Sequence, residues 1–238
     1  MNTLYTISMK ELKSYFFSPL AYVIMTVFTL LAGYFFTGII FQTRNANEFS
    51  SFINTVSGLL ILVIPIITMR SFAEENRAGT FELLLSYPLA SWHVVLGKFI
   101  GATLFTFVMI LPTFIYVTFL EMYSVPDYGI ITGGYTGLIL LSMCYISFGL
   151  FASSLTKSQV VAAISCFGML LMLWAVDMLV EQLGYNIGAV LRTISLRFHF
   201  YFFSIGVIDS RGIVFILSVI VFMLLLTVKI IEDKRFRS

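Results

Sequence analysis

The sequence predicts an all-α integral membrane protein with six spanning helices. Of its 238 residues, 59% are hydrophobic and 11% are charged, whereas soluble domains carry roughly 25% charged residues. The hydrophobic residues also gather in six long runs without a charged side chain. A helix of such a run is long enough to cross a hydrocarbon core of roughly 30 Å. The runs are 20–41, 51–69, 99–120, 130–153, 159–176 and 212–228. We therefore interpret residues 1–238 as a single transmembrane domain.

Residues 1–18, before the first run, are predicted to form an interfacial helix. Four apolar residues recur every three or four positions and share one face, namely Tyr5, Met9, Leu12 and Phe16. Lys10, Glu11 and Ser14 lie away from that face. A helix of this kind lies in the plane of the membrane surface. The alternative is a frayed cytoplasmic tail.

Two prolines and two glycines indicate special helix geometry in the second and third runs. Pro65 and Pro112 lie inside those runs. Proline removes a backbone donor, so we expect a helix kink at each. Gly97 and Gly101 form a pair of small residues one turn apart, which suits close contact between helices.

The polar stretch 70–98 is the longest interior break between the apolar runs. A charged segment between two spans is expected to sit in water, where it can meet a soluble partner. Glu74 and Arg77 stand three residues apart and could pair on a helix that extends the second span; Glu75 lies between them. Gly79 is expected to break that helix. Lys98 closes the stretch.

A second short helix is predicted inside the same stretch, over Phe81–Tyr87. Thr80 can cap its start, and Glu82 lies in its first turn, where a carboxylate suits the helix dipole. Pro88 ends it. A short, stiff helix held between two spans can move as a rigid body and transmit a push. The plain alternative is a folded loop without such a role.

The external segment 177–211 is the other informative polar region. Its polar residues include Arg192, Arg197, His199, Asp209 and Arg211, and five aromatic residues including Phe200 crowd positions 198–203. Aromatic residues beside arginines favour the headgroup level of a bilayer. The segment is therefore either a pair of short re-entrant helices or a folded external loop that covers the bundle, and the sequence leaves both open.

The distribution of Lys and Arg between the loops predicts the orientation. With six spans, both termini share one side with the stretch 70–98 and the turn after span four. Ten Lys and Arg residues lie on that side and four, Arg44, Arg192, Arg197 and Arg211, on the other. Because positive charge favours the cytoplasmic side, we expect both termini there.

Several kinds of chemistry find no matching pattern in the sequence. It contains no G-x-x-x-x-G-K-[ST] phosphate loop, and the topology places its two histidines, His93 and His199, on opposite sides. The spans carry no ionised side chain near mid-bilayer, as a proton-coupled transporter or an intramembrane hydrolase would need. Cys144 and Cys166 suit packing. We therefore expect no catalytic residue, no metal site and no cofactor in this chain. A net charge of +2 suggests no nucleic-acid partner.

The run from Met69 to Leu89, continuing to Gly97 and Lys98, resembles the signature of type-2 ABC exporter permeases. It contains the pattern E-E-x-x-x-G-T-x-E-x-L-L-x-x-P from Glu74 to Pro88. The six-span layout and the leading interfacial helix fit along the whole chain. A second run, from His199 and Phe200 through Gly206 to Arg211, resembles the gliding-motility-type branch of that family.

This resemblance implies a fold, partners and roles for particular residues. The fold is the type-2 ABC exporter transmembrane domain, working as a dimer with a second permease copy or a paralogue in the bacterial cytoplasmic membrane. A separate cytoplasmic ABC ATPase subunit would hold ATP and Mg and engage a coupling helix within 79–88 through Glu82. Paired re-entrant helices within 182–211 would close the outer gate. Spans one and five would line the dimer interface.

The function expected from these arguments is a permease subunit that couples ATP hydrolysis on its partner to export of a substrate. The alternative is a non-transporting membrane scaffold of an ATPase-driven envelope or motility assembly. A cavity at the dimer interface would distinguish them, because a transport path needs one and a scaffold can be packed solid. Apolar span walls suit a lipid-like or hydrophobic cargo, or no cargo.

Overall fold

A computed structural model describes residues 3–43, 49–79, 90–123, 126–182, 193 and 195–237. Every regular element in these ranges is helical. In chain order they are α1 (Thr3–Phe16), α2 (Pro19–Thr43), α3 (Phe49–Thr68), α4 (Arg70–Ala78), α6 (Ser91–Ile110), the 3-10 turn η2 (Leu111–Thr113), α7 (Phe114–Tyr123), α8 (Tyr128–Leu155), α9 (Gln159–Gln182), α11 (Leu196–Ser204) and α12 (Ser210–Arg237).

Six helical segments of the described chain are long and apolar enough to cross a membrane. They are Pro19–Ile39, Phe49–Ala78, Ser91–Met122, Tyr128–Leu155, Gln159–Val176 and Ser210–Arg235. The predicted all-α fold with six spans is therefore confirmed. The second and third spans are longer than the apolar runs that predict them, because the polar stretch between them is helical at both ends.

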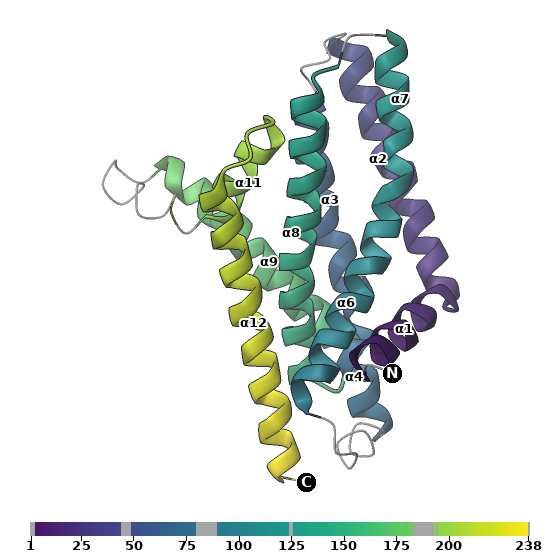
Figure 1. Ribbon diagram of the computed structural model, residues 1–238, viewed down its shortest axis with the longest axis vertical. Helices are drawn as coiled ribbons and strands as arrows, with labels where there is room; N and C mark the ends of the chain where they lie inside the picture. The colour runs from purple at the N-terminus through teal and green to yellow at the C-terminus, as the bar shows by residue number, and fades with distance from the viewer. Residues whose placement is uncertain are drawn as a thin grey trace.

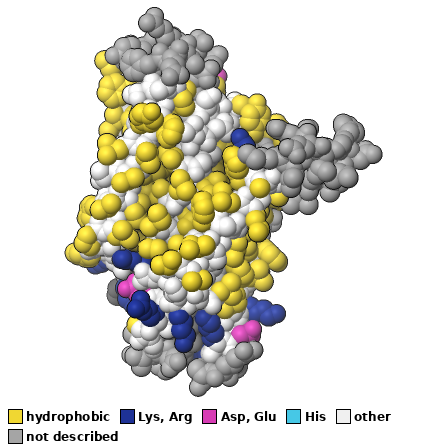
Figure 2. All heavy atoms as spheres, turned by 180° about the vertical axis from the view of Figure 1, so that it is seen from behind, with side chains coloured by type: hydrophobic (Ala, Val, Ile, Leu, Met, Phe, Trp, Pro, Cys, Tyr) yellow, Lys and Arg dark blue, Asp and Glu magenta, His cyan; other side chains and the backbone are white. Residues whose placement is uncertain are grey.

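Helix α8 lies at the centre of the bundle and packs against α3, α6, α9, α11 and α12 (Figure 1). Its glycines allow these neighbours to come close. At Gly134 an added Cβ would lie 2.8 Å from Ile53 of α3, and at Gly137 it would lie 2.5 Å from Phe203 of α11. By contrast, α2, α9 and α12 turn much of their apolar surface outward, where lipid can cover it, and Figure 2 shows this hydrophobic band.

One end of the bundle gathers α4, the turn between α8 and α9, and the last turns of α12, and we call it the basic end. Two hydrogen bonds hold it together: Asn76 Nδ2 donates to Thr156 O at 3.3 Å, and Lys234 Nζ donates to Ser154 O at 2.6 Å. Figure 2 shows lysine and arginine side chains collected below the hydrophobic band at this end.

Helix α1 crosses the bundle near the basic end and packs against α6 (Figure 1). Tyr5, on its apolar face, is 58% exposed, while Ser8 is buried. Glu11 lies off the apolar face, as predicted, but it points into the protein rather than into water. Glycines on α6 explain this orientation, since a Cβ at Gly97 would lie 2.5 Å from the Ile7 side chain and one at Gly101 would lie 2.8 Å from Glu11 Cβ.

The two prolines lie at different kinds of position in their spans. Pro112 is in η2, the 3-10 turn that separates α6 from α7 within the third span. Pro65 is inside α3, one turn before that helix ends at Thr68. Its carbonyl accepts a hydrogen bond from Met69 N at 3.0 Å, at the junction of α3 and α4.

Candidate coupling site at the base of α4

Helix α4 carries the second span into the polar stretch. Its buried side is Ser71, Phe72 and Ala73, and its exposed side includes Glu74 and Arg77. Gly79 follows with φ of 69°, the left-handed conformation that glycine adopts without steric cost and that commonly ends a helix. The predicted helix break at Gly79 is therefore present in the structure.

Ser153 of α8 anchors the first turn of α4. Its Oγ accepts hydrogen bonds from Phe72 N at 2.9 Å and from Ala73 N at 3.0 Å, and it donates to Met69 O at 3.3 Å. Amide groups in the first turn of a helix need partners from outside that helix. A side chain of another helix supplies one here, so the start of α4 is fixed to the centre of the bundle.

An ion triad joins α1, α4 and α6. Lys98 Nζ of α6 lies 2.8 Å from Glu11 Oε1 of α1 and 2.8 Å from Glu75 Oε1 of α4. The side chains of Lys98, Glu11 and Glu75 are 3%, 14% and 22% exposed. The cation is therefore buried, and the two carboxylates are largely shielded from solvent. The ammonium also lies 5.2 Å from the ring centroid of Phe72. A buried charge is tolerated when it is paired in this way.

This triad corrects the expectation that Lys98 sits in water. It also shows what sequence reasoning about local pairs missed. The predicted ion pair between Glu74 and Arg77 is not observed. Both ion pairs within the described residues are made by Lys98. Glu75, between those two, turns inward instead. Its Oε2 is buried and has no hydrogen-bond partner among the described residues.

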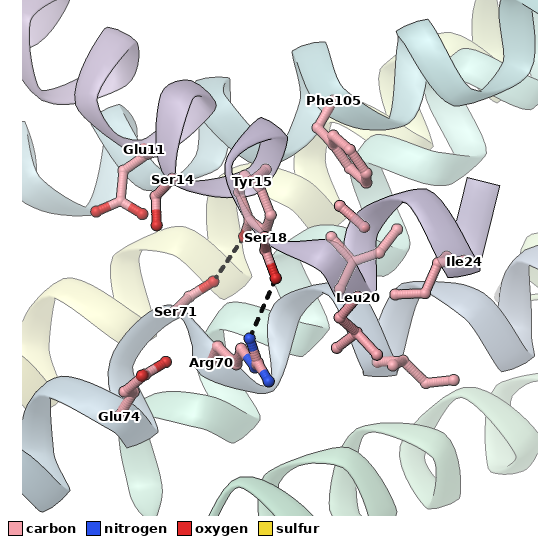
Figure 3. Close-up of a pocket in the computed structure, with 13 residues that line it drawn as sticks. Glu11, Ser14, Tyr15, Ser18, Leu20, Ile24, Arg70, Ser71, Glu74 and Phe105 are labelled. Atoms are coloured by element: carbon pink, nitrogen blue, oxygen red, sulfur yellow. Dashed lines mark hydrogen bonds between the residues drawn. The ribbon is translucent and has the colours of Figure 1, made fainter.

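A second set of contacts, one helical turn from the triad, ties α1 and the connection after it to α4. The hydroxyls of Tyr15 and Ser71 lie 3.1 Å apart, and Arg70 Nη1 donates to Ser18 Oγ at 3.3 Å (Figure 3). The Tyr15 ring stacks on Phe105 of α6 with centroids 5.1 Å apart. Burial raises the pKa of the Tyr15 hydroxyl to about 12.

The remaining predicted coupling residues, Thr80, Glu82 and Pro88, lie outside the described residues, as does the helix predicted over Phe81–Tyr87. The structure places the two helices that flank this segment: α4 ends at Ala78, followed by Gly79, and α6 begins at Ser91. Lys98 of α6 and Glu75 of α4 connect these two helices near that point.

At the opposite end of α8, helix α11 contains part of the predicted gate segment. Ser195 caps it by accepting a hydrogen bond from Phe198 N at 3.0 Å. Phe200 and Phe203 are fully buried, and Phe203 lies against Gly137 of α8. At 1.5 Å per residue, Gly137 lies roughly 14 Å along α8 from its start. Helix α11 therefore packs against the side of α8, as both a re-entrant helix and a folded loop covering the bundle would.

The other residues of this segment are spread over separate contacts. Arg197 lies over the Trp174 ring at 5.1 Å, and His199 packs on Phe215 at 4.5 Å between ring centroids. Asp209 Oδ1 accepts from Arg211 N at 2.9 Å, at the start of α12. They do not form one cluster. Sequence reasoning also missed Ser204, whose Oγ accepts a hydrogen bond from Asn54 Nδ2 of α3 at 3.1 Å.

Comparison with known proteins places this architecture in a family. A search of curated proteins finds the probable multidrug ABC transporter permease YbhR of Escherichia coli K12, and the same protein of Escherichia coli O157:H7, each 31% identical over 108 residues. The match covers 44% of this chain and 28% of the length of each relative. The sequence model of the ABC-2 family transporter proteins matches residues 5–201. Since that match extends over most of the chain, this protein belongs to the ABC-2 family of transporter proteins.

Proposed function

We propose that this chain is the permease subunit of an ATP-driven exporter and that residues 79–88 receive the push of a separate ATPase subunit. The observation that carries the proposal is the attachment of α4 to three other helices. Ser153 fixes its start to α8, and Glu75 joins it through Lys98 to α6 and α1. A force on the segment between Gly79 and Ser91 therefore acts on the second and third spans together.

The helices that such a push would move are those that meet at this site. Helix α4 continues α3, and α6 begins the third span, so both ends of the coupling segment are ends of spanning helices. Because α1 is joined to the same lysine, it would move with them. Pro65 and the 3-10 turn at Pro112 lie farther along those spans, where a backbone hydrogen bond is missing and bending costs least.

The remaining parts of the proposal rest on family membership and on charge. The ATPase partner would hold ATP and Mg, and a second permease copy or paralogue would complete the dimer. The basic end would face the cytoplasm with both termini, as the Lys and Arg distribution favours. Helix α11, with Arg197, His199 and Phe200, and the start of α12, with Asp209 and Arg211, would serve the outer gate. The apolar walls of the spans would suit a hydrophobic cargo, and the resemblance of the run from His199 to Arg211 would put the chain in the gliding-motility-type branch.

The test is a charge reversal at Glu82 in the complex with its partner. Purification of the full chain from membranes should recover an ABC ATPase, identified by mass spectrometry. Glu82→Lys should leave the permease folded and strongly reduce the stimulation of ATP hydrolysis by that partner. Glu232→Lys is the matched control, since Glu232 is an exposed acid on α12 near the same end. Normal stimulation by Glu82→Lys would contradict the coupling role, and recovery without any ATPase would contradict the function itself.

A further inference from the structure

A pocket of about 150 Å³ opens between α1, the start of α2 and the junction of α3 and α4 (Figure 3). One wall is polar and carries Ser18, Arg70 and Glu74, while another is apolar and carries Leu20 and Ile66. The Tyr15 and Phe105 rings, stacked on one another, also line it. A pocket with charged groups on one side and aliphatic groups on the other suits an amphiphilic ligand.

The residues of the second span continue this division along the helix. Leu62, Ile66, Arg70 and Glu74 follow one another at intervals of four, which places them along one slowly turning stripe. Leu62 and Ile66 are 52% and 39% exposed, and Arg70 and Glu74 are exposed as well. The charged half lies on α4, toward the basic end, and the aliphatic half lies on α3. A phospholipid presents its headgroup and acyl chain in the same order.

The charges on this stripe have no opposite charge bound to them in the described part of the chain. Arg70 donates to the Ser18 hydroxyl, and neither Arg70 nor Glu74 takes part in the ion pairs of Lys98. A cation and an anion, one helical turn apart, therefore line the same pocket. A guanidinium matches the geometry of a phosphate, and a carboxylate accepts hydrogen bonds from an ammonium group.

We propose that this pocket binds the headgroup of a zwitterionic phospholipid with a primary amine, of the phosphatidylethanolamine type. The phosphate contacts Arg70 and the Ser18 hydroxyl, the ammonium contacts Glu74, and one acyl chain lies along Ile66 and Leu62. An anionic lipid fits less well, because Glu11 and Glu74 both line the pocket and Arg70 is the cation among its lining residues. The pocket volume of about 150 Å³ is well above the roughly 10–15 Å³ that one water molecule needs, so a group of several non-hydrogen atoms can enter.

A lipid in this position has a structural consequence. It bridges Ser18, in the connection between α1 and α2, to Arg70 and Glu74 of α4. It therefore stabilises the position of α1 against α4 beside the Lys98 triad, whose Glu11 also lines the pocket. This assignment concerns the membrane surface of the folded chain and does not depend on the exporter proposal.

The test is lipid titration of the purified full chain in detergent micelles, followed by native mass spectrometry. Phosphatidylethanolamine, phosphatidylcholine and phosphatidylglycerol with identical acyl chains are compared with soluble phosphoethanolamine. The wild type should bind phosphatidylethanolamine about tenfold more tightly than the other lipids. Arg70→Gln should lose that binding, and Glu74→Gln should bind phosphatidylethanolamine and phosphatidylglycerol equally. Lys13→Gln, which removes an exposed cation of α1 outside the pocket, should keep the wild-type preference.

Three outcomes would overturn the proposal. Equal binding of all three lipids by the wild type would mean a general lipid layer rather than a headgroup site. Unchanged binding by Arg70→Gln would remove the phosphate contact. Binding of phosphoethanolamine as tight as that of the intact lipid would identify a soluble ligand instead. If Arg70→Gln does not fold, the lipid preference of the wild type still decides the question.

Discussion

Replacement of Lys98 by methionine should destabilise this protein more than most single changes. The substitution removes the cation between Glu11 and Glu75, whose Oε1 atoms both lie 2.8 Å from its nitrogen. Two carboxylates about 5 Å apart repel each other by about 3 kcal/mol at an effective dielectric constant of about 20. Breaking a buried ion pair from one side costs about 3–5 kcal/mol in other proteins. We therefore expect a loss of about 3–5 kcal/mol in the free energy of unfolding.

Thermal unfolding in detergent micelles measures this loss. At about 2–4 °C per kcal/mol for a chain of this size, Lys98→Met should lower Tm by roughly 6–20 °C. Fluorescence of Trp92 reports on the site, because it lies on α6 less than two turns before Lys98. Lys10→Met, at an exposed lysine of α1, is the control and should not change Tm.

A triple variant separates the charge effect from lost packing. Glu11→Gln and Glu75→Gln, combined with Lys98→Met, remove the repulsion and should recover most of the stability, since a neutral replacement of a buried ion group is often nearly harmless. The reasoning fails if Lys98→Met melts with the wild type, or if the triple variant melts no higher than Lys98→Met.

Three further predictions concern the same site. Ser153→Ala removes the oxygen to which Phe72 N and Ala73 N donate, so it should lower the free energy of unfolding by about 1–3 kcal/mol and speed amide hydrogen exchange at the start of α4. Ser158→Ala, at an exposed serine, is the control and should do neither. Gly101→Leu should displace α1 and speed tryptic cleavage after Lys13, because an added Cβ there would lie 2.8 Å from Glu11 Cβ. Gly38→Leu is the control, since no atom lies within 4 Å of its added Cβ. Equal cleavage of the two variants would contradict the close packing of α1 on α6. Tyr15→Phe should lose about 0.5–1.5 kcal/mol below pH 10. Burial raises the pKa of Tyr15 from 10.0 to about 12, so the hydroxyl ionises first in the unfolded chain, and the wild type should lose stability between pH 10 and 12. Tyr15→Phe should lack this loss. If Tm depends on pH in the same way for both proteins, the burial of the hydroxyl is contradicted.

Part of the candidate site follows from local sequence rules. The helix from Arg70 to Ala78 and its end at Gly79 could be predicted because helix continuation and glycine termination depend on neighbouring residues. The close contact at Gly97 and Gly101 could also be expected, although not that α1 is the partner. Glu82 remains a prediction from the resemblance, since its position lies outside the described residues.

The sequence by itself determined the class of this protein, its six spans and the break after span two. The reason is that bilayer thickness and the rise of an α-helix translate directly into lengths of apolar runs. Only the tertiary structure decided where the charges go. Glu11 and Lys98 are 87 positions apart, so no local spacing rule connects them. Once α1 packs on the glycines of α6, the two charges meet in a buried site, and Glu75 turns inward to join them rather than pairing along its own helix.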